Sequence, residues 1–240
     1  MVTKNQIKLV KSLQQKKYRT QHKLFVVEGK KTVFELIEAG LEPFQLFVDA
    51  KIENGEFKDF EKISASELKQ MSSLNTPSGV LGVFHMPINN SIETLDWVVA
   101  LDNVRDPGNL GTIIRLCDWF GIKQLICSLG TVDCYNPKVL QATMGSIARV
   151  NVVYIDLVNY LKETPQPIYG AFMDGESVYT SELPKNGVLV MGNEANGISA
   201  EIESIISKRM AIPQFGEQTT ESLNVATATA ILLSEIRRGG

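Results

Sequence analysis

The second half of the chain alternates short apolar runs with helical patterns, and this alternation restricts the fold more than any other feature. "WVVALDNV" and "VLVMG" have the length and composition of buried strands, while "GNLGTIIRLCDWFG" has the spacing of an amphipathic helix. Strands that alternate with helices form parallel sheets covered on both faces. The expected strands are 97–104, 124–128, 150–155, 168–173, 188–192 and 209–213, and the expected helices are 108–121, 137–146, 199–207 and a final helix after 224. The two strands 150–155 and 168–173 are expected to follow each other without a helix.

The first half has the same alternation on a smaller scale. After a basic first helix, the pattern predicts strands at 24–29, 44–49 and 79–84 and helices at 30–40 and 64–72. The segment "MPINNSIET" that follows is polar and contains a proline, which is typical of a linker. We therefore expect two α/β domains, 1–88 and 95–240, joined by a linker at 89–94.

Composition excludes several classes of protein. No apolar run approaches the ~20 residues that cross a bilayer, and no apolar signal region follows the basic N-terminus. The three cysteines form no C-x-x-C pair, and the two histidines stand apart. These features predict a cytoplasmic protein with neither a membrane partner nor a metal site.

Positive charge is concentrated at the start of the chain. The net charge of the whole chain is −3, but residues 1–31 hold nine lysines and arginines and one glutamate. A helix with cations around an apolar stripe suits contact with a phosphate backbone. A solvated surface helix is the plain alternative, and composition alone does not separate the two.

Three loops that follow predicted strands are rich in Gly, Asn and charged residues: "DNVRDPGNLGTIIR", "GNEANGIS" and "PQFGEQTTESLN". Ligands of parallel sheets bind beyond the carboxyl ends of the strands, where such loops lie. Each loop taken alone also fits a turn followed by a helix cap. Glu194 is not needed for capping, however, and Asn109 and Arg115 open an otherwise apolar helix.

Taken together and in this order, the three loops resemble the three motifs of the SpoU (TrmH) branch of the SPOUT RNA methyltransferases, over residues 97–237. The preceding part resembles, more loosely, the ribosomal-protein-L30e-like substrate-binding domain that often precedes this catalytic domain. The resemblance implies a parallel-sheet α/β domain with a C-terminal trefoil knot, S-adenosylmethionine as cofactor, and 2'-O-methylation of a ribose in structured RNA by a homodimer. Ribosomal RNA is favoured over tRNA as the substrate.

The resemblance also assigns residues. Asn109, Arg115, Glu194, Ser222 and Asn224 match positions associated with activity or substrate placement. Thr143, Met144, Gly192, Asn193, Ile212 and Leu223 are the expected cofactor contacts. Lys11, Lys16, Lys17, Arg19, Lys23 and Lys30 are the candidate RNA contacts. The family proposal that Arg115 acts as a base is disfavoured, because a guanidinium keeps its proton in proteins, so we expect it to orient RNA instead.

Two other classes of function compete with this interpretation. A noncatalytic RNA-binding or ribosome-assembly protein would also need the basic segment and the L30e-like half. A nucleotide-dependent oxidoreductase would suit the sheet, but the sequence lacks the glycine-rich phosphate-binding fingerprint that such enzymes carry.

Overall fold

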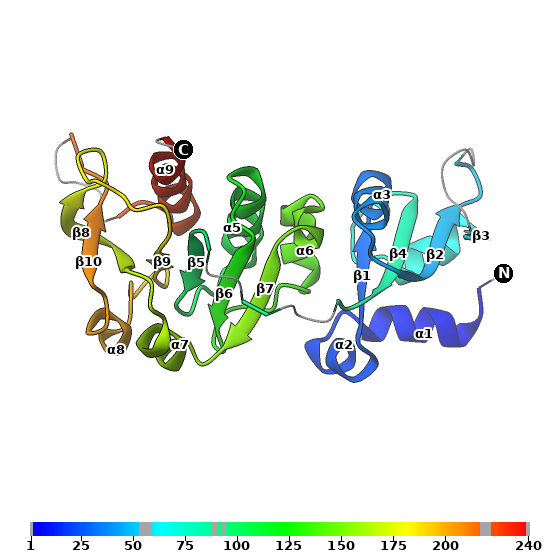
Figure 1. Ribbon diagram of the computed structural model, residues 1–240. Coiled ribbons are helices and arrows are strands. Elements are labelled where there is room, and N and C mark those ends of the chain that lie inside the picture. Colours follow the sequence, from blue (N-terminus) through cyan, green and yellow to red (C-terminus); the bar gives the residue numbers. More distant parts are fainter. Residues whose placement is uncertain (1, 53–58, 88–90, 93–94, 217–221, 239–240) are drawn as a thin grey trace. The chain divides into compact units, whose positions relative to one another are not determined.

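The computed structural model describes residues 2–52, 59–87, 91–92, 95–216 and 222–238 (Figure 1). It divides into two compact units, one formed by Met1–Ile88 with Asp133–Ala148 and the other by Asn89–Val132 with Arg149–Gly240. The sequence placed 133–148 within its second domain, whereas in the structure this segment joins the first unit. Most of the expected linker 89–94 lies outside the described residues.

The first unit is built on a four-stranded sheet with the strand order β1-β4-β2-β3. β4 is antiparallel to both β1 and β2, and β2 is parallel to β3. The elements are α1 (Lys4–Ser12), α2 (Lys16–His22), β1 (Leu24–Glu28), α3 (Lys30–Glu38), β2 (Pro43–Asp49), β3 (Glu61–Ile63), α4 (Ala65–Met71), β4 (Val80–His85), α6 (Pro137–Thr143) and a 3-10 turn at Ser146–Ala148.

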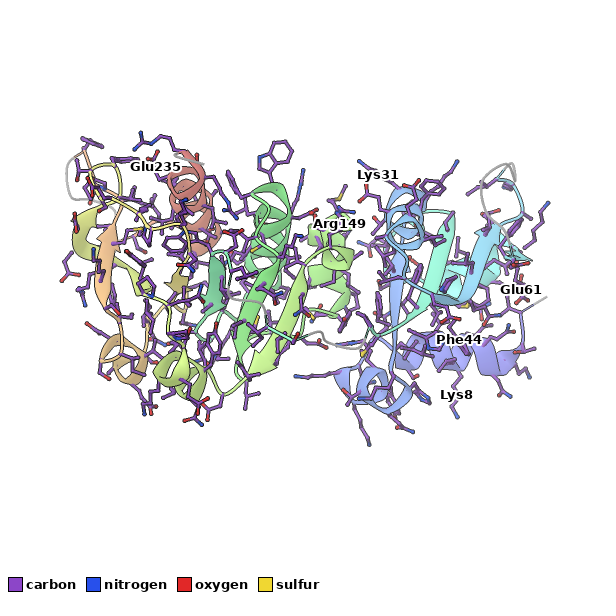
Figure 2. The ribbon with its side chains drawn as sticks, viewed as in Figure 1. Lys8, Lys31, Phe44, Glu61, Arg149 and Glu235 are labelled. Atoms are coloured by element: carbon purple, nitrogen blue, oxygen red, sulfur yellow. The ribbon has the colours of Figure 1, made fainter. Side chains whose placement is uncertain are left out.

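Local sequence accounts for the start of two of these helices. Thr3 before α1 and Ser64 before α4 each accept a hydrogen bond from the backbone three residues later, and the residue there, Gln6 or Glu67, bonds back to the cap. This reciprocal capping box satisfies N–H groups that a helix start leaves unpaired. Glu61 of β3, labelled in Figure 2, also accepts a hydrogen bond from Gln6 Nε2 at 2.9 Å, which attaches α1 to the edge of the sheet.

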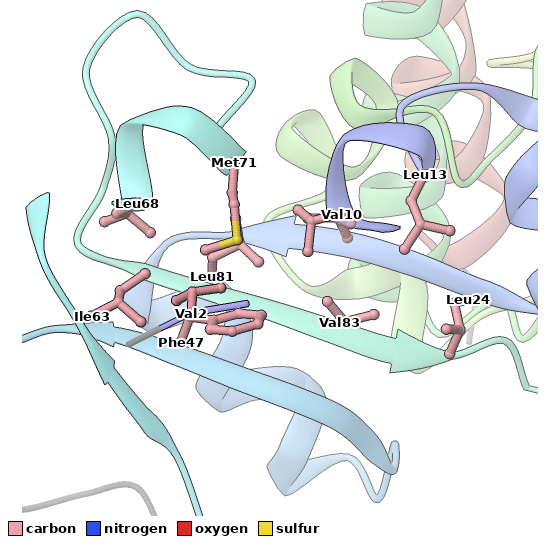
Figure 3. Close-up of a cluster of buried hydrophobic side chains, with 11 residues drawn as sticks. Val2, Val10, Leu13, Leu24, Phe47, Ile63, Leu68, Met71, Leu81 and Val83 are labelled. Atoms are coloured by element: carbon pink, nitrogen blue, oxygen red, sulfur yellow. The ribbon is translucent and has the colours of Figure 1, made fainter. Parts of the chain in front are cut away.

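The core of the first unit lies between the sheet and helices α1 and α4 (Figure 3). Val10 of α1 and Leu13, which follows α1, pack with Val83 of β4 and Phe47 of β2, and each of these side chains is at most 1% exposed. Burial of such side chains contributes on the order of 1.5–3 kcal/mol each. The N-terminal residues are therefore a structural part of this unit as well as a source of positive charge.

The second unit contains the predicted parallel sheet. Its six strands have the order β10-β8-β9-β5-β6-β7, and every neighbouring pair is parallel. The elements are β5 (Val98–Leu101), α5 (Pro107–Trp119), β6 (Gln124–Ser128), β7 (Asn151–Ile155), α7 (Leu157–Glu163), β8 (Ile168–Ser177), β9 (Val188–Met191), α8 (Ala200–Glu203), β10 (Lys208–Ala211) and α9 (Val225–Arg238).

Helices cover both faces of this sheet. α7 and α8 pack over Val98, Ala100 and Val190 on one face, and Figure 1 shows α5 and α9 together on the other. The expectation of two successive strands at 150–155 and 168–173 is wrong, because α7 lies between them. The α/β class predicted from the alternation of strands and helices is confirmed.

The C-terminal helix is fixed at its far end by one arginine. Arg237 Nη1 and Nη2 bind the two carboxylate oxygens of Asp96 at 2.8 and 2.6 Å, and Arg237 Nε donates to the carbonyl of Phe120 at 2.9 Å. These bonds join α9 to the residues before β5 and to the end of α5. The end of α9 is thereby attached to the rest of the second unit.

Candidate functional site

A cavity of about 770 Å³ opens at the carboxyl ends of β9 and β10 in the second unit. Ligand pockets in proteins have volumes of about 300–1,000 Å³. Its walls come from β8, from the loop after β9, from the segment after β10 and from the start of α9. The residues of the last two sequence motifs that line it include Gly192, Asn193, Glu194, Ile212, Ser222, Leu223 and Asn224.

Gly192 ends β9 at a point where no side chain fits. A Cβ atom at this position would lie 2.2 Å from the carbonyl carbon of Gly197 and 2.3 Å from the backbone nitrogen of Ile198. The loop folds back so closely because Asn193 and Gly197 exchange two backbone hydrogen bonds, at 2.8 and 2.9 Å. Gly197 has φ +68, which favours glycine. Backbone groups therefore form this wall of the cavity.

Asn193 stabilises the same loop with its side chain. Its Oδ1 accepts hydrogen bonds from the backbone N–H of Ala195 and Asn196, and its Nδ2 donates to the carbonyl of Asn103 at 2.7 Å. Asn103 follows β5 in the left-handed conformation, with φ 57. The loops after β5 and β9 are thus bonded to each other.

Asp102 makes a second connection between these loops. It is 2% exposed, and its two carboxylate oxygens accept hydrogen bonds from Asn103 Nδ2 and from the backbone N–H of Ser199, both at 2.7 Å. Sequence reasoning did not select Asp102 or Asn103. An acid directly after the buried run "VVAL" was the available signal, because a charged residue is rarely buried without partners.

Glu194 ties the loop after β9 to the start of α5. Its Oε1 accepts hydrogen bonds from the backbone N–H of Asp106 at 3.1 Å and from Asn109 Nδ2 at 3.0 Å. Its Oε2 accepts one from the backbone N–H of Arg105 at 3.2 Å. The carboxylate therefore positions the loop of the first motif.

The protonation state of Glu194 follows from these contacts. Partial desolvation raises the pKa of Glu194, but the hydrogen bonds from Asn109 and from the backbone N–H groups of Glu194, Arg105 and Asp106 outweigh it, so the pKa lies below its ordinary value. The group is ionised at neutral pH. Both of its oxygens already accept hydrogen bonds, which suits an anchor better than a proton acceptor.

Asn109 also connects the start of α5 to the start of α9. Its Oδ1 accepts a hydrogen bond from Asn224 Nδ2 at 2.9 Å, while Asn224 Oδ1 caps α9 by accepting from the backbone N–H of Ala226 and Thr227. Glu194, Asn109 and Asn224 therefore form one hydrogen-bonded chain that joins all three sequence motifs. The side chain of Asn224, directly before α9, both caps this helix and connects it to α5.

The other expected site residues do not take part in these hydrogen bonds. Ser222 and Leu223 are exposed and line the cavity, as does Ile212. Arg115 is exposed on α5, and its guanidinium makes no hydrogen bond or ion pair to another residue that the structure describes. Glu194 forms no hydrogen bond or ion pair with Arg115.

Thr143 and Met144 do not line the cavity; they belong to the segment 133–148 of the first unit. Thr143 is fully buried, and its hydroxyl donates to the carbonyl of Leu140 at 2.8 Å. Met144 ends α6 with φ 51. Their expected cofactor contact has no support in the geometry of the cavity.

The candidate RNA contacts separate into two groups. Lys11, Lys16, Lys17, Lys23 and Lys30 are exposed. Arg19, in contrast, is 2% exposed, and its guanidinium binds Asp133 Oδ2 at 2.5 Å and the carbonyls of Leu13 and Gln14. Assigning Arg19 to RNA is therefore wrong, because a buried guanidinium with these partners cannot reach a phosphate.

Within the described ranges no helix is long and apolar enough to cross a membrane, and no three histidine, cysteine or acidic side chains gather as a metal site would require.

Comparison with known proteins matches both halves of the chain. Residues 96–234 match the SpoU rRNA Methylase family, and residues 4–82 match the MRM3-like substrate binding domain. The 23S rRNA (guanosine(2553)-2'-O)-methyltransferase RlmP of Bacillus subtilis is 32% identical over 98% of this chain and 97% of its own length.

Two solved structures have the same fold over the whole chain. A TrmH-family protein from Porphyromonas gingivalis is 38% identical with a TM-score of 0.90, and each chain is covered completely. An AdoMet-bound rRNA methyltransferase from Sinorhizobium meliloti is 28% identical with a TM-score of 0.87, covering 100% of this chain and 96% of its own. With its three motifs joined by hydrogen bonds and its family match over more than half its length, this chain belongs to the SpoU rRNA methylase family.

Proposed function

We propose that this protein transfers a methyl group from S-adenosylmethionine to a ribose 2'-hydroxyl of ribosomal RNA. The observation that carries the proposal is the cavity at the ends of β9 and β10, whose walls combine the second and third motifs of the family. The full-length similarity to RlmP supports rRNA as the substrate. The match of residues 4–82 to a substrate binding domain supports a role of the first unit in holding that RNA.

The residues of the cavity fit this cofactor. Gly192 lines the cavity with backbone atoms only, and Phe172, Met191, Ile212 and Leu223 supply apolar surface. A bound S-adenosylmethionine supplies an electrophilic methyl group on a positively charged sulfur. Gly192, Asn193, Ile212 and Leu223 are the residues that would hold the cofactor, and the apolar wall excludes water from it.

The hydrogen-bonded side chains Glu194, Asn109 and Asn224 position the loops of the site and do not exchange protons with the substrate. Glu194 is ionised, and its oxygens are occupied by hydrogen bonds from Arg105, Asp106 and Asn109. Arg115 carries an exposed guanidinium, so it donates to a phosphate beside the target ribose and orients the hydroxyl. The hydroxyl proton leaves to a phosphate oxygen or to water. Holding reactants in line can contribute ~7–11 kcal/mol in favourable systems.

Substitution of Arg115 separates this role from that of a base. Arg115→Lys is expected to lose as much methyl transfer as Arg115→Ala, because an ammonium group cannot make the paired contacts of a guanidinium. The rate is measured with saturating cofactor over a range of pH. Near-full activity of Arg115→Lys with a shifted pH profile would show instead that this residue takes the proton.

The remaining features of this proposal come from family resemblance. We infer a trefoil knot at the C-terminal end of the second unit, a homodimer in solution and a cytoplasmic location. Sedimentation equilibrium tests the homodimer, since a single species of twice the chain mass is expected.

The function itself is tested by transfer of radiolabelled methyl from S-adenosylmethionine to total RNA from a strain that lacks the gene. Label that resists alkaline cleavage in the rRNA fraction is the expected result. Label in the tRNA fraction would show that the substrate is tRNA and not rRNA. Absence of label together with no shift of the melting temperature by S-adenosylmethionine would favour a noncatalytic RNA-binding protein.

A further inference from the structure

One end of the sheet in the first unit carries an exposed pair of aromatic rings. Phe44 near the start of β2 is 48% exposed, and its ring meets the ring of His85, at the end of β4, with 5.6 Å between centroids and an interplanar angle of 84°. His85 is exposed as well. Figure 2 labels Phe44 among the side chains of this unit. Neither ring belongs to the core between the sheet and helices α1 and α4.

A β-bulge produces this arrangement. Pro43 lies opposite Phe84 and Gln45 lies opposite Val83, so Phe44 is an extra residue with no partner on β4. In a regular strand Phe44 would share the face of Leu46, because side chains alternate between faces. His85 shares the face of Val83 instead, and the bulge allows Phe44 to reach it. Bulges that redirect a side chain are concentrated near functional sites.

Positive charge lies at the same end of the sheet. β1 begins at Leu24, which is paired with His85. The backbone carbonyl of the preceding Lys23 accepts a hydrogen bond from the backbone N–H of Met86 at 2.8 Å. Lys23 has φ 55, so the chain turns sharply here and its side chain is exposed. Glu42, an exposed acid, also lies here, and its carbonyl accepts from the backbone N–H of His85.

Exposed aromatic rings beside a cation match the chemistry of unpaired RNA. Single-stranded segments are bound by stacking their bases on aromatic side chains while lysines contact the phosphates. We propose that Phe44 and His85 form a platform on which one unpaired base of the RNA substrate stacks, with Lys23 contacting an adjacent phosphate. This inference rests on the proposed function, and it names the part of the RNA that the first unit recognises: a single-stranded loop or bulge.

Three substitutions of Phe44 in the full-length protein test the platform. Phe44→Ala removes the ring, Phe44→Leu keeps apolar surface without a π face, and Phe44→Trp keeps a π face. The probe is a fluorescein-labelled 12-nucleotide oligoadenylate, with a fully paired RNA duplex of equal length for comparison. Binding is measured by fluorescence anisotropy, and thermal unfolding by circular dichroism checks that each variant is folded.

Phe44→Ala and Phe44→Leu are each expected to weaken oligoadenylate binding about tenfold, while Phe44→Trp binds at least as tightly as the unsubstituted protein. Duplex binding should change little in all three, because paired bases do not stack on the platform. Equal affinity of all variants for oligoadenylate would overturn the proposal. So would an unsubstituted protein that binds oligoadenylate no better than duplex.

The methyl-transfer assay is run separately on the unsubstituted protein. Methylated rRNA together with equal binding by the Phe44 variants would reject the platform and leave the proposed activity intact. Weaker oligoadenylate binding by Phe44→Ala and Phe44→Leu without any methyl transfer would support the platform and reject the activity.

Discussion

At the scale of single residues, the carboxylate of Glu194 holds the loop of the first motif against that of the second. Replacing it by glutamine places an NH₂ group opposite the N–H donors of Asp106, Asn109 or Arg105. Because the side chain is largely exposed, we expect a loss of only about 1 kcal/mol, or ~2–4 °C in melting temperature at pH 7. Glu163→Gln, at the exposed end of α7, is the matched control and should change the melting temperature by less.

The pH dependence of this effect has a definite sign. The pKa of Glu194 in the folded protein is lowered, so its stabilisation is present above the unfolded-state pKa of about 4.3 and is lost as the pH falls through the folded value. The difference in melting temperature between the unsubstituted protein and Glu194→Gln should therefore shrink below about pH 4. A difference that stays constant to pH 3 would show that Glu194 acts through something other than its charge.

Residue patterns identified the loops that carry the site but not the contacts within it. Asn109, Glu194 and Asn224 were selected from three separate loops, and the structure brings them into one hydrogen-bonded chain. The burial of Arg19 could not be predicted, because its partner Asp133 lies 114 positions further along the chain. A basic residue among lysines gives no local sign that it is paired.

At the scale of elements, the turn after β9 depends on the absence of a side chain at Gly192. A methyl group in Gly192→Ala would meet backbone atoms of Gly197 and Ile198 within 2.3 Å, which only a movement of the loop relieves. We expect Gly192→Ala to weaken S-adenosylmethionine binding at least tenfold, measured by isothermal titration calorimetry. Gly216→Ala is the control, since its Cβ would meet no described atom within 4 Å. Equal affinity of both variants for S-adenosylmethionine would mean that cofactor binding does not depend on this turn.

Helix α2 depends in a similar way on the buried guanidinium of Arg19. Arg19→Met leaves the Asp133 carboxylate without its cationic partner at a site where the two side chains are 3% and 14% exposed. A loss of about 3 kcal/mol is expected in urea unfolding followed by circular dichroism. Lys17→Met, two residues away on the exposed surface, should lose less than about 0.5 kcal/mol. Similar stabilities of the two variants would contradict a structural role for Arg19.

Sequence periodicity predicted most elements, and the exceptions have physical causes. The signals for α7 were present in "DLVNYLKE", where Asp156 caps the helix by accepting from Asn159 and where Leu157 and Leu161 lie one turn apart. The strand β3 has only three residues, too few to show alternation. Strand order was not predictable, because it depends on pairing between distant segments.

At the scale of the whole molecule, the exposed lysines of α1 and α2 are expected to set the salt dependence of RNA binding. Truncating residues 1–31 is a poor test, since Val10, Leu13 and Leu24 belong to the core of the first unit. Replacing Lys11, Lys16, Lys17 and Lys23 by glutamine together should reduce the slope of log affinity against log salt for rRNA by about 3, at ~0.7–0.9 per lysine. Glutamine at Lys162 and Lys185 of the second unit is the control. An unchanged slope would place the phosphate contacts elsewhere.

The path of the chain between the two units limits how this protein can be divided or recombined. The first unit includes Asp133–Ala148, so the polypeptide passes from one unit to the other after residues 88, 132 and 148. A fragment that begins at residue 95 keeps α6 but loses β1, against which α6 packs, and so leaves the buried side chains of Val139 and Leu140 uncovered. The first unit is consequently not a separately exchangeable module. A gene fusion or a recombination event that exchanged it would also have to bring a matching α6, so the two halves are expected to be inherited together.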